Sequence, residues 1–157
     1  MKNIDELFEI IPAYPGLEIA YIDDGSFGFR ENFIDFAKKT EASLYIKDTN
    51  ASQKERDSFV TIEPFNFDDK RYTKHSILYD YIFVASNLKD KNIEEILKKL
   101  YRVAKNAAHV FLFVANEDMD QIEKFLEDTN FVAINKIDEI EKFQIISAKK
   151  MHGWAKV

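Results

Sequence analysis

Residues 79–116, YDYIFVASNLKDKNIEEILKKLYRVAKNAAHVFLFVAN, predict a buried strand, a helix and a second buried strand. Residues 79–86 and 109–114 are short apolar runs, rich in β-branched and aromatic residues, without the polar alternation of a one-sided sheet. We expect both to be central strands. Between them apolar residues recur every three or four positions, as in an amphipathic helix: Ile93, Ile96, Leu97, Leu100 and Tyr101. Two parallel strands joined by such a helix predict a layered α/β sheet.

The segment before this unit contains two further strands and two helices. We expect them in this order: a short helix over residues 3–11, a strand over 17–22, a helix over 29–39 and a strand over 42–47. Two glycines within residues 23–28, DDGSFG, predict a tight turn between the first strand and its helix. The chain therefore begins as an alternation of strands and helices.

The next connections are shorter. Residues 50–57 are polar and predict at most two helical turns, and residues 68–76 predict a loop. The intervening run, residues 59–67, begins as a strand, and Pro64 removes a ladder donor, so pairing is expected to stop near Glu63. The second crossover and the layer before residue 79 are thus reduced.

The segment after residue 116 predicts a helix and a terminal hairpin. Ile122, Phe125 and Leu126 form one apolar face over residues 119–128. Two strands, residues 131–137 and 143–148, follow with a five-residue gap, which is of hairpin length. We therefore expect a mostly parallel, Rossmann-like sheet with helices on both faces and an antiparallel C-terminal hairpin.

Composition excludes several classes of protein. The 157 residues, 46% of them hydrophobic, predict one folded domain over residues 1–157, with a core built largely from its 14 Phe and 7 Tyr. Zero cysteines exclude disulfides and thiolate catalysis, and three scattered histidines leave little for a metal site, so no metal is expected. The net charge of −6 disfavours a general nucleic-acid binder.

Nothing in the sequence predicts a membrane segment. No apolar run approaches the ~20 residues that a spanning helix needs. The start, MKNIDELFEI, carries acidic residues where a signal peptide has a basic end. We therefore expect a cytoplasmic protein.

The central unit also resembles a known family. YDYIFVASN (residues 79–87) and EEILKKLYRVAKNAAHVFLFV (residues 94–114) are similar to the fourth strand, the following helix and the fifth strand of the class I S-adenosylmethionine-dependent methyltransferases. Arg102 and Lys105 stand at the family's Arg-hydrophobic-Leu-Lys positions, and Ala107 and Ala108 replace its two glycines. The resemblance covers nearly the whole chain and is to a trimmed or degenerate member.

The resemblance implies a site for S-adenosylmethionine beyond the carboxyl ends of the strands. Asp23 and Gly25 match the acidic residue and the first glycine of the family pattern (D/E)-x-G-x-G-x-G, and Phe27 stands at the second glycine. Asp48 matches the carboxylate that binds the ribose hydroxyls. The cofactor-binding residues implied in this way are Asp23, Gly25, Ser26, Phe27, Gly28, Asp48, Asn66 and Ser86. No catalytic residue is assigned.

Each of these residues also has a structural interpretation. Asp23 and Gly25 suit an ordinary strand-to-helix turn, and Asp48 suits a cap or a loop. Ser86-Asn87-Leu88-Lys89 lacks the Asn/Asp-Pro-Pro-aromatic motif of the family's base-modifying members, which disfavours methylation of DNA or RNA bases. Asn87 then suits a turn before the helix.

Two functions from different classes remain open. The first is a small methyltransferase-like protein that binds S-adenosylmethionine or a related nucleoside and transfers a methyl group to an unknown acceptor. The alternative is a non-catalytic, degenerate domain that acts in protein–protein interaction or dimerisation. We also expect a homodimer, because the reduced connections at residues 50–57 and 68–76 predict an uncovered apolar face on the sheet.

Overall fold

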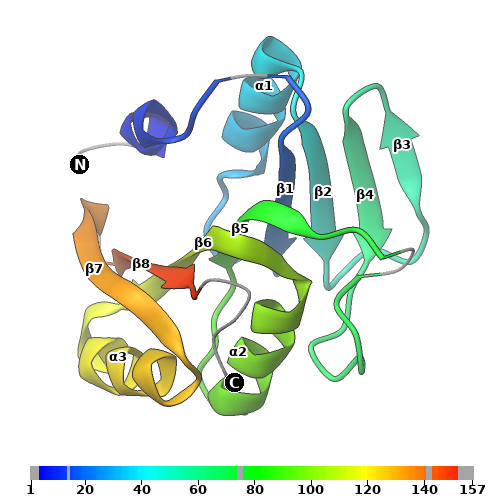
Figure 1. Ribbon diagram of the computed structural model, residues 1–157. Coiled ribbons are helices and arrows are strands. Elements are labelled where there is room, and N and C mark those ends of the chain that lie inside the picture. The colour runs from blue at the N-terminus through cyan, green and yellow to red at the C-terminus, as the bar shows by residue number, and fades with distance from the viewer. Residues whose placement is uncertain (1–3, 14, 74–75, 141–142, 152–157) are drawn as a thin grey trace.

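The computed structural model describes residues 4–13, 15–73, 76–140 and 143–151. Within them lies one sheet of eight strands, in the order β3-β4-β2-β1-β5-β6-β8-β7 (Figure 1). The strands are β1 (Glu18–Asp23), β2 (Ser43–Asp48), β3 (Glu55–Asp57), β4 (Val60–Pro64), β5 (Tyr79–Ala85), β6 (Ala104–Ala115), β7 (Phe131–Ile140) and β8 (Phe143–Lys150). The helices are η1 (Ile4–Ile10), α1 (Arg30–Thr40), α2 (Ile93–Val103), η2 (Asn116–Asp118) and α3 (Met119–Asp128).

The strand directions confirm the mostly parallel sheet. β4, β2, β1, β5 and β6 are parallel neighbours in that order, and β8 lies antiparallel between β6 and β7. The chain runs outward from β1 through β2 to β4, then returns to the other side of β1 as β5. The sheet therefore changes winding direction between β1 and β5, where open α/β sheets bind ligands.

Helices cover both faces of the sheet, as expected. η1 and α1 lie on one face, and α2 and α3 on the other (Figure 1). The core under η1 and α1 contains packed rings, with Phe33 tilted against Tyr21 and Phe83 stacked on Phe111. The second core buries the apolar faces of α2 and α3, with Leu97, Leu100 and Leu126 fully buried. The helical periodicity of the sequence thus identified the buried helix faces correctly.

The expectation of helical turns over residues 50–57 is wrong. Glu55–Asp57 instead form β3, a short edge strand antiparallel to β4. A tight turn at Ser58, with φ of 52°, joins the two strands. All three residues of β3 are exposed and charged, and charged side chains on a short edge strand discourage pairing with another chain.

The remaining element bounds differ from the expectations by a few residues, except in β6. This strand begins five residues before the expected start at His109. Its early part contains an irregularity, because Ala104 pairs with Tyr79 and His109 pairs with Tyr81. Ala107 lies within it at φ of 67°, a left-handed conformation that favours glycine. Residue 3 and residues 74–75, at the ends of two expected elements, lie outside the described residues.

The half of the sheet without a crossover helix is polar. Lys47 on β2 and Glu63 on β4 form an ion pair at 2.7 Å, with the Lys47 side chain only 5% exposed. Thr61 on β4 is also buried, on the same face. A cluster of Phe65, Phe67 and Tyr72 packs at the end of this half. The uncovered apolar face that led us to expect a homodimer is therefore absent from the described residues.

No helix in the described part of the chain is both long enough and apolar enough to span a membrane.

Candidate functional site

Two carboxylates end neighbouring strands at the point where the sheet changes direction. Asp23 is the last residue of β1, Asp48 is the last residue of β2, and the two are partners in register. Both are buried, Asp23 to 4% exposure and Asp48 to 9%. Parallel pairing therefore brings together two carboxylates that are 25 positions apart in the sequence, as the resemblance implied.

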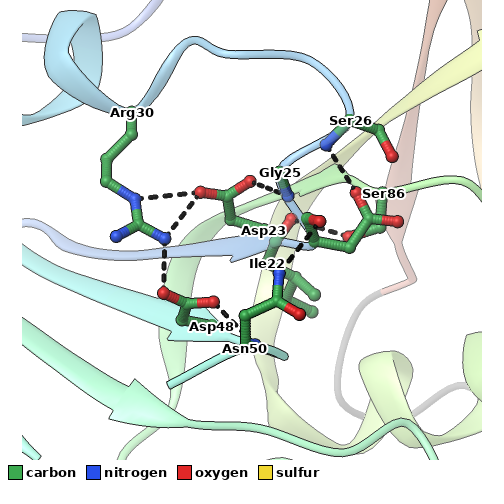
Figure 2. A network of polar contacts seen from close by, with 9 residues as sticks. Ile22, Asp23, Gly25, Ser26, Arg30, Asp48, Asn50 and Ser86 are labelled. Carbon is green, nitrogen blue, oxygen red and sulfur yellow. Dashed lines mark hydrogen bonds and ion pairs between the residues drawn. The ribbon is translucent and has the colours of Figure 1, made fainter.

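Arg30, the first residue of α1, joins the two carboxylates (Figure 2). Its Nε and Nη2 donate to Asp23 Oδ2 at 2.9 and 2.8 Å, and Nη2 also donates to Asp48 Oδ2 at 2.6 Å. The two carboxylates hold the pKa of Arg30 above its usual value despite partial burial. One cation thus balances part of the negative charge at the strand ends.

The turn after β1 has the glycine geometry that the sequence predicted. Gly25 has φ of 86°, and its N–H donates to Asp23 Oδ1 at 2.8 Å. A Cβ at Gly25 would meet only the Nδ2 of Asn50, at 3.8 Å. Gly28 has φ of 72° and open space beside it. The Gly25 turn is therefore not plugged by an aromatic ring.

Phe27 points away from this turn. Its ring packs edge-on against Phe143 at 4.7 Å and against Phe113 at 5.6 Å between centroids. These contacts place the ring toward β6 and β8, where it lines a cavity. The phenyl group at the second glycine position of the family pattern is thus part of a cavity wall and leaves the space beside Gly25 free.

Asp24 connects the loops that follow three strands. Its carboxylate accepts from the N–H of Ser26 and the N–H of Asn87, both at 2.9 Å. Its backbone oxygen accepts from Asn50 Nδ2 at 3.2 Å. We call Asp24, Asn50 and Asn87 the loop bridge. It ties together the loops after β1, β2 and β5.

Two cavities lie beyond the carboxyl ends of the strands. Cavity 1, of about 550 Å³, is lined by residues that include Thr49, Phe65 and Asn66. Cavity 2, of about 780 Å³, is lined by the loops after β1, β5 and β6 and by α3. Asp90 and Lys91 line both cavities. The crevice expected above the centre of the sheet is therefore open in two adjoining parts.

Three of the eight predicted site residues line the cavities, whereas Asp23, Gly25, Gly28 and Asp48 line neither. Ser26 and Phe27 line cavity 2, and Asn66 lines cavity 1, where its side chain accepts from the N–H of Asp68 at 2.8 Å. Ser86 is fully buried, lines neither cavity, and donates its hydroxyl to the carbonyl of Ile22 at 3.1 Å. Ser86 thus fastens β5 to β1 beneath the site.

Sequence reasoning missed Arg30 and Asn50. The sequence placed Arg30 in the expected helix over residues 29–39 without a role in the site, and Asn50 in the polar connection over residues 50–57. The signal for Arg30 was its position seven residues after Asp23, where the helix that follows the glycine turn begins. Its second partner, Asp48, could be found only from the register of β1 and β2.

His109 lies away from the crevice. It pairs with Tyr81 and Lys149 in the first half of β6, and its ring stacks on Tyr81 at 5.8 Å. Burial, followed by the charge of Lys149, lowers the pKa of His109 below its usual value. The structure thus places it as a packed histidine, consistent with the absence of an assigned base.

The fold is that of the S-adenosylmethionine-dependent methyltransferases. A carbon methyltransferase domain named CurJ has a TM-score of 0.71 at 14% identity, over 94% of this chain and 52% of that one. A protein from Listeria monocytogenes, described as a candidate S-adenosylmethionine-dependent methyltransferase, has a TM-score of 0.69 at 15% identity, over 94% and 97%. Phosphoethanolamine N-methyltransferase 2 from Haemonchus contortus, solved with S-adenosylmethionine, has a TM-score of 0.64 at 16% identity, over 83% and 37%.

These likenesses define the architecture of the chain and confirm the class I, Rossmann-like resemblance. The chain spans about half of the CurJ domain and about a third of the Haemonchus enzyme. No protein-family model and no curated protein sequence matches it. The chain is therefore methyltransferase-like in fold.

Proposed function

We propose that this protein binds S-adenosylmethionine or a related nucleoside in the crevice formed by cavities 1 and 2, and transfers a methyl group to a small acceptor. The observation that carries the proposal is the open pair of cavities at the point where the sheet changes direction. Neighbours of the same fold were solved with S-adenosylmethionine, which supports the choice of ligand.

The dimensions and lining of the cavities support this assignment. Both volumes fall within the range of roughly 300–1,000 Å³ that small-molecule sites occupy. In the proposal, the adenine binds in cavity 1, whose wall contains the rings of Phe65 and Phe67 and the side chain of Asn66. Cavity 2, with Phe27, Phe113 and Phe143 in its wall, takes the acceptor.

Asp48 retains the capacity to bind a ribose. Its Oδ2 accepts from Arg30 and its Oδ1 from the N–H of Asn50 at 2.8 Å. A carboxylate offers about four acceptor positions, so these two bonds leave two positions for ribose hydroxyls, and the next residue, Thr49, lines cavity 1. Arg30 keeps the carboxylate oriented while it does so.

Methyl transfer needs little further chemistry from the protein. The reaction requires a nucleophile held in line with the sulfonium methyl group, and positioning alone supplies much of the rate. When bound, S-adenosylmethionine supplies the activated methyl group. The role of this chain is to bind the nucleoside, to hold the acceptor against it and to exclude water.

Isothermal titration with S-adenosylmethionine and S-adenosylhomocysteine tests the proposal. We expect micromolar binding of at least one of them, and a loss of about tenfold or more in Asp48→Asn, because the amide removes the charge that accepts the ribose hydroxyls. Asp57→Asn, an exposed change on β3, is the matched control and should bind as the parent does.

A second readout uses the ligand instead of a variant. If Asp48 accepts from the ribose, adenosine should bind more tightly than 2′-deoxyadenosine to the unaltered protein. The absence of heat with every nucleoside at millimolar concentration would exclude the proposed function.

A non-catalytic domain is the second candidate. The Arg30 bridge favours it, because Asp23 and Asp48 already have a cationic partner inside the protein. In that case titration shows no nucleoside binding, and the domain acts by interacting with another protein chain. A cytoplasmic location also stays a prediction.

A further inference from the structure

We infer that Asp24 makes the crevice select against a ligand that carries an amino-acid carboxylate, and favour an adenosine derivative whose 5′ substituent is neutral or cationic. This inference rests on the proposed function and narrows its ligand to the related nucleosides that lack an amino-acid carboxylate, which should bind more tightly than S-adenosylmethionine itself. It places Asp24 as a specificity-determining residue of the nucleoside site.

The first step concerns the donors at the mouth of the crevice. The backbone N–H groups of Ser26 and Asn87 come from the loops after β1 and β5, on the two sides of the point where the sheet changes direction. Backbone N–H groups that converge in this way bind anions. Here the carboxylate of Asp24 accepts from both at 2.9 Å, so a ligand carboxylate cannot use these donors.

The second step concerns charge. Asp24 itself does not line cavity 2, but its carboxylate lies 2.9 Å from the backbone nitrogens of Ser26 and Asn87, which do, so its charge acts directly behind this part of the wall. The wall of cavity 2 carries the carboxylates of Asp90, Glu117 and Asp118 against the ammonium groups of Lys89 and Lys91. Adding Asp24 makes this part of the crevice more negative. A second carboxylate brought there by a ligand would be repelled.

The third step concerns the cations that could compensate. Arg30 is committed to Asp23 and Asp48. Lys91 Nζ lies over the ring of Phe67, at 5.1 Å from its centroid, on the side of cavity 1. Lys89 is exposed at the rim. Among the described residues around the Gly25 turn, no buried cation therefore faces a ligand carboxylate, whereas an ammonium group would meet carboxylates.

A matched pair of ligands isolates the carboxylate. S-adenosylhomocysteine and its decarboxylated analogue have the same adenosine, thioether and ammonium groups, and differ only in the carboxylate. By titration calorimetry, we expect the unaltered protein to bind the decarboxylated analogue about tenfold or more tightly. Equal affinities, or tighter binding of S-adenosylhomocysteine, would overturn the inference and leave the proposed function standing.

Two variants locate the effect. In Asp24→Asn the discrimination should fall to about threefold or less, chiefly through tighter binding of S-adenosylhomocysteine, because the like charge is removed. Asp118→Asn removes one charge from the wall of the same cavity at the end of η2, and should change the ratio of affinities by less than Asp24→Asn does. An unchanged ratio in Asp24→Asn, or an equal fall in Asp118→Asn, would contradict the role of Asp24.

The outcomes also separate this inference from the proposed function. If neither ligand nor adenosine binds at millimolar concentration, nucleoside binding is excluded and the inference falls with it. If Asp24→Asn does not fold, as thermal denaturation would show, the ratio measured on the unaltered protein decides alone.

Discussion

Arg30 is the residue on which the geometry of the two strand ends depends. It holds Asp23 and Asp48, which are buried and adjacent, through one guanidinium group. Without it, two carboxylates would face each other in a place that water reaches poorly. A buried charge that loses its partner costs more than the ion pair contributes, because the desolvation of the remaining charge is no longer offset.

Arg30→Met should therefore destabilise the protein. We expect a loss of about 2 kcal/mol in the free energy of unfolding, less than for a fully buried pair because the Arg30 side chain is 31% exposed. Urea denaturation measures it. The control is Lys38→Met. Lys38 lies on the same helix as Arg30 and forms an exposed ion pair with Asp57 of β3, so this change should lower the free energy of unfolding by less than about 0.5 kcal/mol. Equal effects would show that the bridge does not stabilise the fold.

At the scale of single residues, the candidate site was predicted in part. Asp23, Gly25 and Asp48 were named from the family resemblance, and the structure places them at the ends of β1 and β2 and in the turn after β1. Arg30 and the loop bridge were not found, because their partners lie on other strands. Only the register of β1 with β2, and the neighbouring position of β5, brings these groups within hydrogen-bonding distance.

The unit of three elements β5, α2 and β6 is the part of the fold that the sequence predicted best. The helix matches its periodicity, and Asn92 caps it by accepting from the N–H of Glu95 at 3.2 Å. β6 holds the main departure, since its first part is irregular and contains Ala107 at φ of 67°. The resemblance placed a glycine of the family at this position. The backbone therefore adopts the conformation of a glycine although the residue is alanine.

Ala107→Gly should stabilise the protein. An L residue in the left-handed region costs roughly 1–2 kcal/mol, and the extra flexibility of glycine in the unfolded chain returns part of this, so we expect a net gain of about 0.5 kcal/mol. Ala108→Gly is the matched control, since Ala108 is buried and has no positive φ, and should lose about 1 kcal/mol. Chemical denaturation of both variants checks the pair. A loss in Ala107→Gly comparable to that in Ala108→Gly would contradict the strain.

At the scale of the whole molecule, polar side chains occupy the face of β2 and β4 where a crossover helix is missing. Lys47, Thr61 and Glu63 occupy the face that lacks a helix, and an aromatic cluster of Phe65, Phe67 and Tyr72 covers its end. Among the described residues, the exposed large apolar side chains are separated along the chain: Ile10, Phe59, Leu78, Val132 and Met151. Both edge strands are also poorly suited to pairing, because β3 is charged and β7 has two register shifts.

The homodimer stays a prediction that the structure does not test. The polar face removes the reason that first led to it, and an interface would have to form elsewhere on the surface. Sedimentation velocity at micromolar concentration measures the oligomeric state. A species of twice the 18.4 kDa chain mass would support the homodimer, and a monomer throughout the concentration range would exclude it.

The sequence by itself determined the class of fold, because both kinds of element have local patterns. Short apolar runs indicate buried strands, and apolar residues at every third or fourth position indicate amphipathic helices. It also determined the position of the glycine turn. Only the tertiary structure decided that Phe27 turns away from Gly25, that β3 is a strand and that Asp24 fills the donors of Ser26 and Asn87. These features depend on contacts between segments far apart in the chain, and such contacts leave no periodic signal in the residues on either side.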